Sequence, residues 1–124
     1  MTVVKTDTAP AAIGPYSQAM IFGNLVFTSG QIPLSLESGQ ISGSSITEQT
    51  EQVIKNLGAV LKAAGSSIDK VIKTTCFLTD MNDFAAFNDV YAKYFTGKPA
   101  RATVAVKQLP KNALVEIEAV AELG

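Results

Sequence analysis

The chain has 124 residues, a formal net charge of −1 and an apolar fraction of 47%, which suits one domain spanning residues 1–124. It has no histidine and one cysteine, so a single chain cannot build a Ser-His-Asp triad, a Cys-His pair or a His- or Cys-ligated zinc site. Nine scattered lysines and one arginine argue against nucleic acid as the main partner, since phosphate binding needs a clustered basic face.

The composition also bears on assembly and location. The mean hydropathy of +0.22 is high and the charged fraction of 17% is low, a combination that subunits of an oligomer can produce. Residues 1–8 lack the apolar core of a secretory signal, and no stretch is long enough to span a membrane. With no disulfide possible inside the chain, we expect a cytoplasmic protein.

The first elements along the chain are predicted strands. Ala19–Phe22 and Leu25–Ser29 flank the dipeptide Gly23-Asn24, a turn signal of β-hairpins. Val3–Lys5 is a candidate extra strand before them. We therefore expect a hairpin near the N-terminus.

A long helix is predicted from about Thr47 to Ala64. Its apolar residues recur on one face at a period near 3.6, and they are Val53, Leu57, Val60, Leu61 and Ala64. Ser45 and Glu48 form a capping-box pattern before the helix, and Gly65 offers a left-handed stop after it.

The next run, Val71–Leu78, predicts a strand, so the long helix joins one strand to another in βαβ manner. A second helix is expected from about Asn82 to Phe95, with Asp80 or Asn82 as its cap. Its stripe is aromatic, consisting of Phe84, Phe87, Tyr91, Tyr94 and Phe95.

Two last strands, Arg101–Val106 and Leu114–Leu123, are expected to pair around a loop that contains Pro110 and Asn112. The order strand, strand, helix, strand, helix, strand, strand predicts an α+β sandwich, one mixed sheet with two helices on one face.

Alternation along these last strands separates two faces of the predicted sheet. Apolar residues such as Val104 and Ile117 are expected to pack against the helices. This would leave four residues on the opposite face: Arg101, Thr103, Glu116 and Glu118. That face is either a solvated surface or an inter-subunit surface with a small-molecule site. Arg101 shifts the balance toward the second interpretation, because the only arginine of the chain can bind a carboxylate through two parallel hydrogen bonds.

Four other residues stand out, and two of them, Asn88 and Tyr16, have both a structural and a functional interpretation. Asn88 lies inside the aromatic stripe, either as a buried amide satisfied by the backbone or as an amide pointing into a pocket. Tyr16 lies in a loop and either packs there or closes over a ligand. Gly30, at a strand end, allows a close approach, and Cys76 is expected to be an inert core thiol.

Three segments together resemble the RidA (reactive intermediate deaminase A, or YjgF) family across nearly the whole chain. They are residues 9–18 (APAAIGPYSQ), residues 28–33 (TSGQIP), and the series Pro99-Ala-Arg-Ala-Thr-Val, Leu109-Pro-Lys and Val115-Glu-Ile-Glu118. The resemblance implies a chorismate-mutase-like homotrimer with ligand sites between subunits, and hydrolysis of 2-imino or enamine acids such as 2-iminobutanoate and 2-iminopropanoate. No metal or organic cofactor is expected.

The resemblance also implies roles for individual residues. Arg101 would hold the substrate carboxylate and Glu116 would orient or activate water. Tyr16, Gly30 and Asn88 match further pocket positions. Thr103 departs from the family, which often has cysteine there; because the family uses this position partly through its backbone, Thr103 should still permit ligand binding.

Two other functions remain open at this point. The same pocket could belong to a metabolite-binding regulatory module without significant catalysis. An older label of the family, ribonuclease or translation inhibitor, is disfavoured by the missing histidine and the missing basic face.

Overall fold

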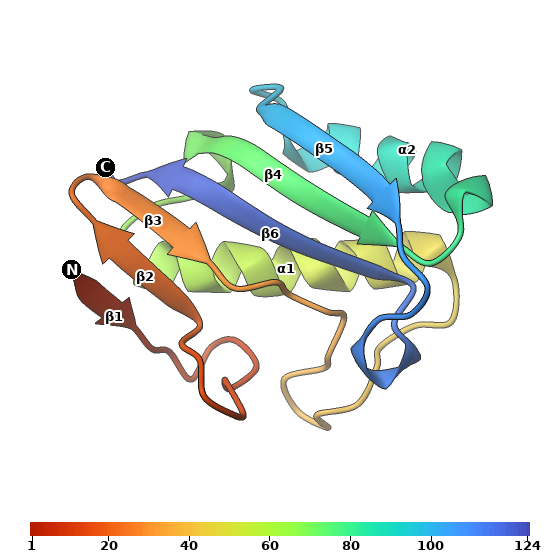
Figure 1. Cartoon of the computed structure of the whole chain (residues 1–124), viewed down its shortest axis with the longest axis horizontal. Helices are drawn as coiled ribbons and strands as arrows, with labels where there is room; N and C mark the ends of the chain where they lie inside the picture. Colours follow the sequence, from red (N-terminus) through yellow and green to blue (C-terminus); the bar gives the residue numbers. More distant parts are fainter.

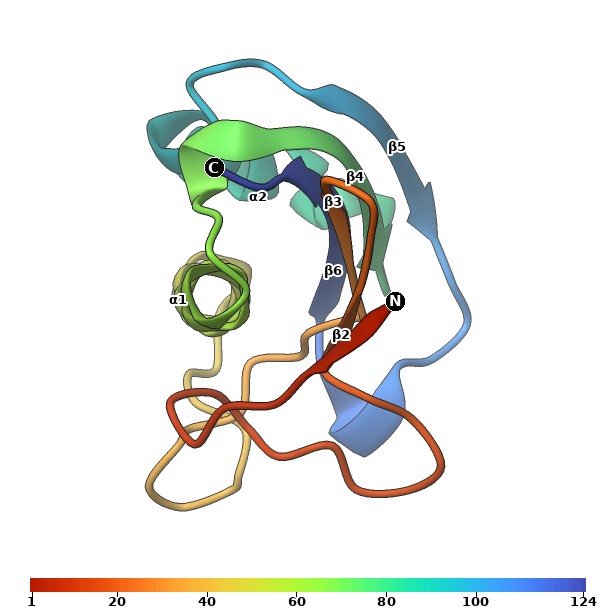
Figure 2. The same ribbon diagram turned by 90° about the vertical axis from the view of Figure 1, so that its left-hand side faces the viewer.

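The computed structural model describes residues 1–124 and contains one six-stranded mixed sheet with two α-helices on one face (Figures 1 and 2). The strands are β1 (Thr2–Val4), β2 (Ala19–Phe22), β3 (Leu25–Thr28), β4 (Val71–Leu78), β5 (Ala100–Ala105) and β6 (Val115–Glu122). The helices are α1 (Ile46–Ala63) and α2 (Phe84–Tyr94), with short 3₁₀ turns at Ile68–Lys70, Met81–Asp83 and Pro110–Asn112. The predicted fold class and order of elements are confirmed.

The sheet has the order β1-β2-β3-β6-β4-β5. All neighbouring strands are antiparallel except β4 and β5, which run parallel. The predicted pairing of the last two strands is wrong, because β6 inserts between β3 and β4 and leaves β5 at the edge (Figure 1). Since α2 carries the chain from β4 to β5, these two strands can lie parallel and adjacent, as a helical crossover permits.

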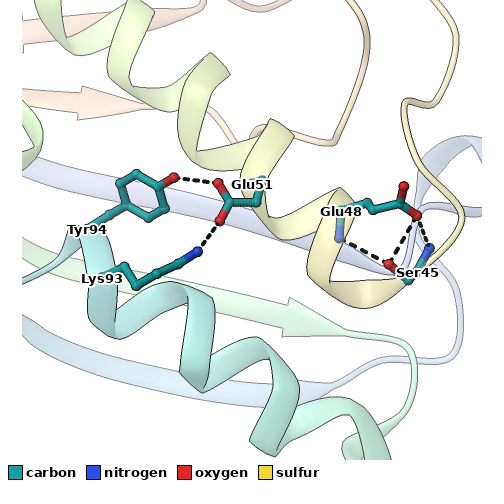
Figure 3. Close-up of polar contacts among 5 residues, drawn as sticks. All are labelled: Ser45, Glu48, Glu51, Lys93 and Tyr94. Atoms are coloured by element: carbon teal, nitrogen blue, oxygen red, sulfur yellow. Dashed lines mark hydrogen bonds and ion pairs between the residues drawn. The ribbon is translucent and has the colours of Figure 1, made fainter.

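Helix α1 begins and ends where its sequence signals predict. Ser45 accepts a hydrogen bond from the Glu48 backbone N–H, and the Glu48 carboxylate accepts from the Ser45 backbone N–H, which completes the capping box (Figure 3). After the helix, Gly65 adopts a left-handed φ of +87°. The apolar face of α1 packs on the sheet, with Val53, Leu57, Val60 and Leu61 fully buried. No helix of the structure combines the length and apolar character needed to cross a membrane.

Helix α2 begins two residues later than predicted, after a 3₁₀ turn that Asp80 caps by accepting from the Asn82 N–H at 2.9 Å. Phe87, Tyr91 and Phe95 of its aromatic stripe are buried. The prediction that Tyr94 belongs to that stripe is wrong. Tyr94 is 38% exposed, and its hydroxyl donates a hydrogen bond to the Glu51 carboxylate on α1 (Figure 3). Lys93 binds the same carboxylate at 2.7 Å, so the contact ties the two helices together.

The two faces of the sheet differ in what covers them. The core of 21 buried residues lies between the sheet and the helices, and β6 contributes Val115, Ile117, Ala119 and Ala121 to it. On the other side, which we call the outer face, no element of the chain covers the sheet (Figure 2). Phe27 and Val104 on this face remain 43% and 46% exposed.

Candidate functional site

Arg101 lies on edge strand β5 and extends over α2. It pairs in register with the buried Thr74 of β4, so both side chains point to the helix side of the sheet. Its guanidinium carbon lies 4.7 Å from the ring centroid of Tyr91, with the rings of Phe84 and Phe87 at 5.5 and 6.0 Å. Each such cation–π contact stabilises an exposed cation by roughly 0.5–1 kcal/mol, so an aromatic surface supports the guanidinium.

Asn88 completes the surroundings of this guanidinium. Its Oδ1 accepts a hydrogen bond of 2.7 Å from Arg101 Nη1. Both side chains line a hollow of about 520 Å³ beside the end of α2, together with Tyr91 and Lys98. The amide therefore points into a pocket, and the alternative of a buried amide satisfied by the backbone is wrong.

Thr103 and Cys76 lie side by side, in register on β5 and β4. The Thr103 hydroxyl is inaccessible beside the Cys76 thiol and forms no hydrogen bond of normal geometry. Burial raises the pKa of the Cys76 thiol to about 11, which keeps it protonated near neutral pH. Cys76 is an inert core thiol as predicted, and the Thr103 hydroxyl points inward, so a ligand at this strand would meet the Thr103 backbone.

Glu116 lies on β6 and points to the outer face, next to Glu118 on the same side of the strand. Its side chain is half-buried. Burial, and in smaller part the negative charge of Glu118, raises the pKa of the Glu116 carboxyl above its usual 4.5. A carboxylate with a raised pKa suits a general base that works near neutral pH.

Gly30 explains part of this burial. The chain after β3 pairs with β6 through two hydrogen bonds between Gln31 and Ile117, at 2.9 and 3.1 Å. This brings Gly30 so close to Glu116 that an added Cβ would lie 2.7 Å from the carboxyl carbon. Glycine here allows the Glu116 carboxylate to approach the backbone closely, and a larger residue would displace that side chain.

Gly30→Ala should therefore displace the Glu116 carboxylate and lower turnover by about 100-fold, the effect of misplacing a reacting group by about 1 Å. Binding of a carboxylate ligand should change little, because the substitution leaves Arg101 and its contacts with Asn88 and Tyr91 unchanged. Steady-state kinetics and calorimetry check both expectations. Gly58→Ala is the matched control, since its new Cβ would meet Ile68 at an ordinary 3.7 Å; equal losses in the two variants would refute the steric argument.

Tyr16 lies on the loop before β2, is 54% exposed, and lines one small hollow together with Gly30. The loop is held by Gln18, a buried amide that accepts from the Thr6 N–H at 2.7 Å and donates to the carbonyls of Thr6 and Pro10 at 3.1 and 2.8 Å. This role of Gln18 is not predicted from the sequence. The signal that could have revealed it is an uncharged amide directly preceding an apolar strand.

The candidate residues thus form two separate groups. The arginine half contains Arg101 and Asn88 on the helix side of the sheet, and the glutamate half contains Glu116, Gly30 and Tyr16. The prediction that Arg101, Thr103 and Glu116 share one face is wrong. The prediction assumed that the apolar residues of β5 face the core. Instead, Ala102 and Val104 lie on the exposed outer face, and the Arg101 guanidinium packs on α2.

Known proteins of similar length resemble this chain in sequence and in structure. The profile of the family described as Endoribonuclease L-PSP matches residues 6–123. A Lactococcus lactis protein named as a candidate regulator, AldR, is 54% identical over 99% of this chain and 98% of its own length. The 2-iminobutanoate/2-iminopropanoate deaminase of Mus musculus is 49% identical over 98% of this chain and 91% of its own. The crystal structure of Escherichia coli TdcF with bound serine superposes with a TM-score of 0.94, at 41% identity and full coverage of both chains.

Proposed function

The chain belongs to the endoribonuclease L-PSP family, the RidA family that its motifs resemble, and on that premise we propose that it hydrolyses 2-imino acids to 2-oxo acids and ammonia. The observation that carries the proposal is an exposed guanidinium supported by aromatic rings on one side of the sheet and a half-buried carboxylate of raised pKa on the other. 2-Iminobutanoate and 2-iminopropanoate are the proposed substrates. Residues 1–124 act as one domain, in the cytoplasm, without a metal or organic cofactor.

Arg101 binds the carboxylate of the substrate in this mechanism. A guanidinium has five N–H donors, and the hydrogen bond to Asn88 uses one of them. The remaining donors can hold a carboxylate through two parallel hydrogen bonds. The backbone of Thr103, on the edge strand β5, borders the bound acid, and this clamp fixes the position of the neighbouring C=N bond.

Glu116 activates the water that attacks that bond. As the water oxygen bonds to C2 of the protonated imine, the carboxylate takes a proton from the water, and a carbinolamine forms. Glu116 then passes this proton to the nitrogen. As the C–N bond breaks with its electron pair leaving on nitrogen, Glu116 takes the proton of the carbinol hydroxyl and the C=O bond forms, which releases ammonia and the 2-oxo acid. Glu116 finally returns its proton to the ammonia or to water, which restores the carboxylate. General base assistance of this kind accelerates a reaction by about 10²–10⁴-fold. Tyr16 and the backbone at Gly30 border the reacting centre.

Because the two halves lie on opposite faces, we infer that each complete site joins the arginine half of one subunit to the glutamate half of the next. The uncovered outer face supports such an assembly. Its exposed Phe27 and Val104 lie beside the half-buried Phe77 and Val120, an apolar surface of the kind that subunits bury against one another. A homotrimer with three equivalent sites follows the family pattern.

An assay with freshly generated 2-iminobutanoate tests this function. The protein should raise the rate of 2-oxobutanoate and ammonia formation above the spontaneous rate. A metabolite-binding regulator, the alternative that the name of the Lactococcus relative favours, would bind 2-oxo acids and leave the spontaneous rate unchanged. A nuclease would cleave RNA in the same preparation, and such activity should disappear on further purification.

The pH dependence of turnover should report Glu116. The base must be ionised, so kcat/KM should rise with pH through the raised pKa of Glu116. Glu118→Gln removes the negative charge that helps raise this pKa, and the acidic limb should therefore move to lower pH. A limb that stays in place or moves to higher pH would contradict the assignment.

A further inference from the structure

Tyr91 contacts the candidate clamp, although the mechanism above gives it no role. Tyr91 lies on α2 and is only 7% exposed. Its ring is the aromatic ring nearest to the Arg101 guanidinium carbon, at 4.7 Å. The ring stacks on Phe95 with centroids 4.2 Å apart. Its hydroxyl shares a hydrogen bond of 2.7 Å with the Thr74 hydroxyl on β4. The ring is therefore fixed from both the helix and the sheet.

We propose that Tyr91 is a positioning residue that sets the orientation of the Arg101 guanidinium for carboxylate binding. Arg101 is itself exposed and makes one hydrogen bond to another side chain, the bond to Asn88. One hydrogen bond leaves a long side chain free to rotate about it. The flat face of Tyr91 removes that freedom, because a planar guanidinium stacks on a ring.

The arrangement also determines which part of the guanidinium remains available. Asn88 occupies a donor at Nη1, and the Tyr91 ring lies 4.7 Å from the guanidinium carbon, which leaves no room for a ligand between them. A ligand carboxylate must then approach the donors that face away from both Asn88 and the ring. The Tyr91–Thr74 hydrogen bond keeps the ring in a fixed relation to strand β5.

The packing can be measured without any ligand, because Arg101 is the only arginine of the chain and gives the only Nε–Hε signal in a ¹H–¹⁵N spectrum. The ring of Tyr91 should shift this signal upfield. In Tyr91→Leu the signal should move toward the position of a free arginine. In Tyr91→Phe it should stay upfield but broaden, because the ring remains and only its hydrogen bond to Thr74 is lost. Val90→Ala is the matched control: it shortens a buried side chain on the same helix and should leave the signal in place.

The binding part of this inference rests on the proposed function. Tyr91→Leu should weaken 2-oxobutanoate binding by roughly 10-fold, and Tyr91→Phe should bind nearly as the wild type does. The loss should vanish in the Arg101→Lys background, where no planar group is left to orient. A merely structural role of Tyr91 would give the same loss in both backgrounds.

The outcomes separate the two claims. An unchanged Arg101 signal in Tyr91→Leu, or an equal loss of binding in the Arg101→Lys background, would overturn the positioning role. A wild-type protein that binds no 2-oxo acid would refute the proposed function, while the Arg101 signal would still decide whether Tyr91 orients the guanidinium. If Tyr91→Leu fails to fold, Thr74→Val provides the test, since it releases the ring and should broaden or shift the same signal.

Discussion

Arg101→Ala should weaken binding of 2-oxobutanoate by at least about 100-fold, because removing one partner of a hydrogen-bonded charge pair leaves the other charge unpaired. The pocket has one other basic residue, Lys98, among its lining residues, but a lysine cannot form the two parallel, coplanar hydrogen bonds of a guanidinium. Arg101→Lys should therefore restore only part of the affinity. Titration calorimetry with a 2-oxo acid measures all three proteins.

The control for this experiment is Lys107→Ala, which removes one positive charge from an exposed position after β5. It changes the net charge of the chain by the same amount as Arg101→Ala and should keep wild-type affinity. If Arg101→Ala binds 2-oxo acids as tightly as Lys107→Ala does, the carboxylate clamp is wrongly assigned.

Glu116→Gln should lower kcat by about 10²–10⁴-fold, the usual contribution of a general base. The amide keeps the size of the side chain but cannot accept the proton of the attacking water. Binding of a 2-oxo acid should change far less, because the proposed clamp for the ligand carboxylate is Arg101. Comparing kcat with the dissociation constant of 2-oxobutanoate separates the two effects.

Glu122→Gln is the matched control, since Glu122 is an exposed carboxylate on the same face of β6. It should leave kcat within about 2-fold of the wild-type value, as exposed substitutions away from a site do. A Glu116→Gln variant that turns over imine at the rate of Glu122→Gln would exclude Glu116 as the base.

Local signals in the sequence predicted the elements well. The capping box of Ser45 and Glu48, the Gly65 stop and the Gly23-Asn24 turn are each set by residues that are neighbours in the chain. Short-range geometry determines such features, so the sequence alone reveals them. The burial of Val115 and Ile117 followed from alternation in the same way.

Long-range features were not predictable in this way. No local signal shows that β6 inserts between β3 and β4, because strand order depends on contacts distant in sequence. The prediction of which side of the sheet each β5 side chain lies on is also wrong. Its alternation has weak contrast, and the apolar residues Ala102 and Val104 lie on the outer face. Apolar residues are expected in the core of their own chain, and this expectation fails for residues that a second chain is proposed to cover.

The candidate site shows the same division. Arg101 and Glu116 could be singled out from the sequence, but their positions on opposite faces could not. Gly30 was recognised as a point of close approach, and the structure identifies the Glu116 side chain as the group that approaches. The supporting role of Gln18 depends on hydrogen bonds across a loop, which no motif specifies.

The division of the site between two subunits is tested most directly by complementation. Arg101→Ala and Glu116→Gln chains, each inactive alone, are unfolded together, refolded as a mixture and assayed with 2-iminobutanoate. If a site takes Arg101 from one subunit and Glu116 from the next, a 1:1 mixture should recover activity at about a quarter of its sites. A mixture that assembles but stays as inactive as the separate variants would contradict a shared site.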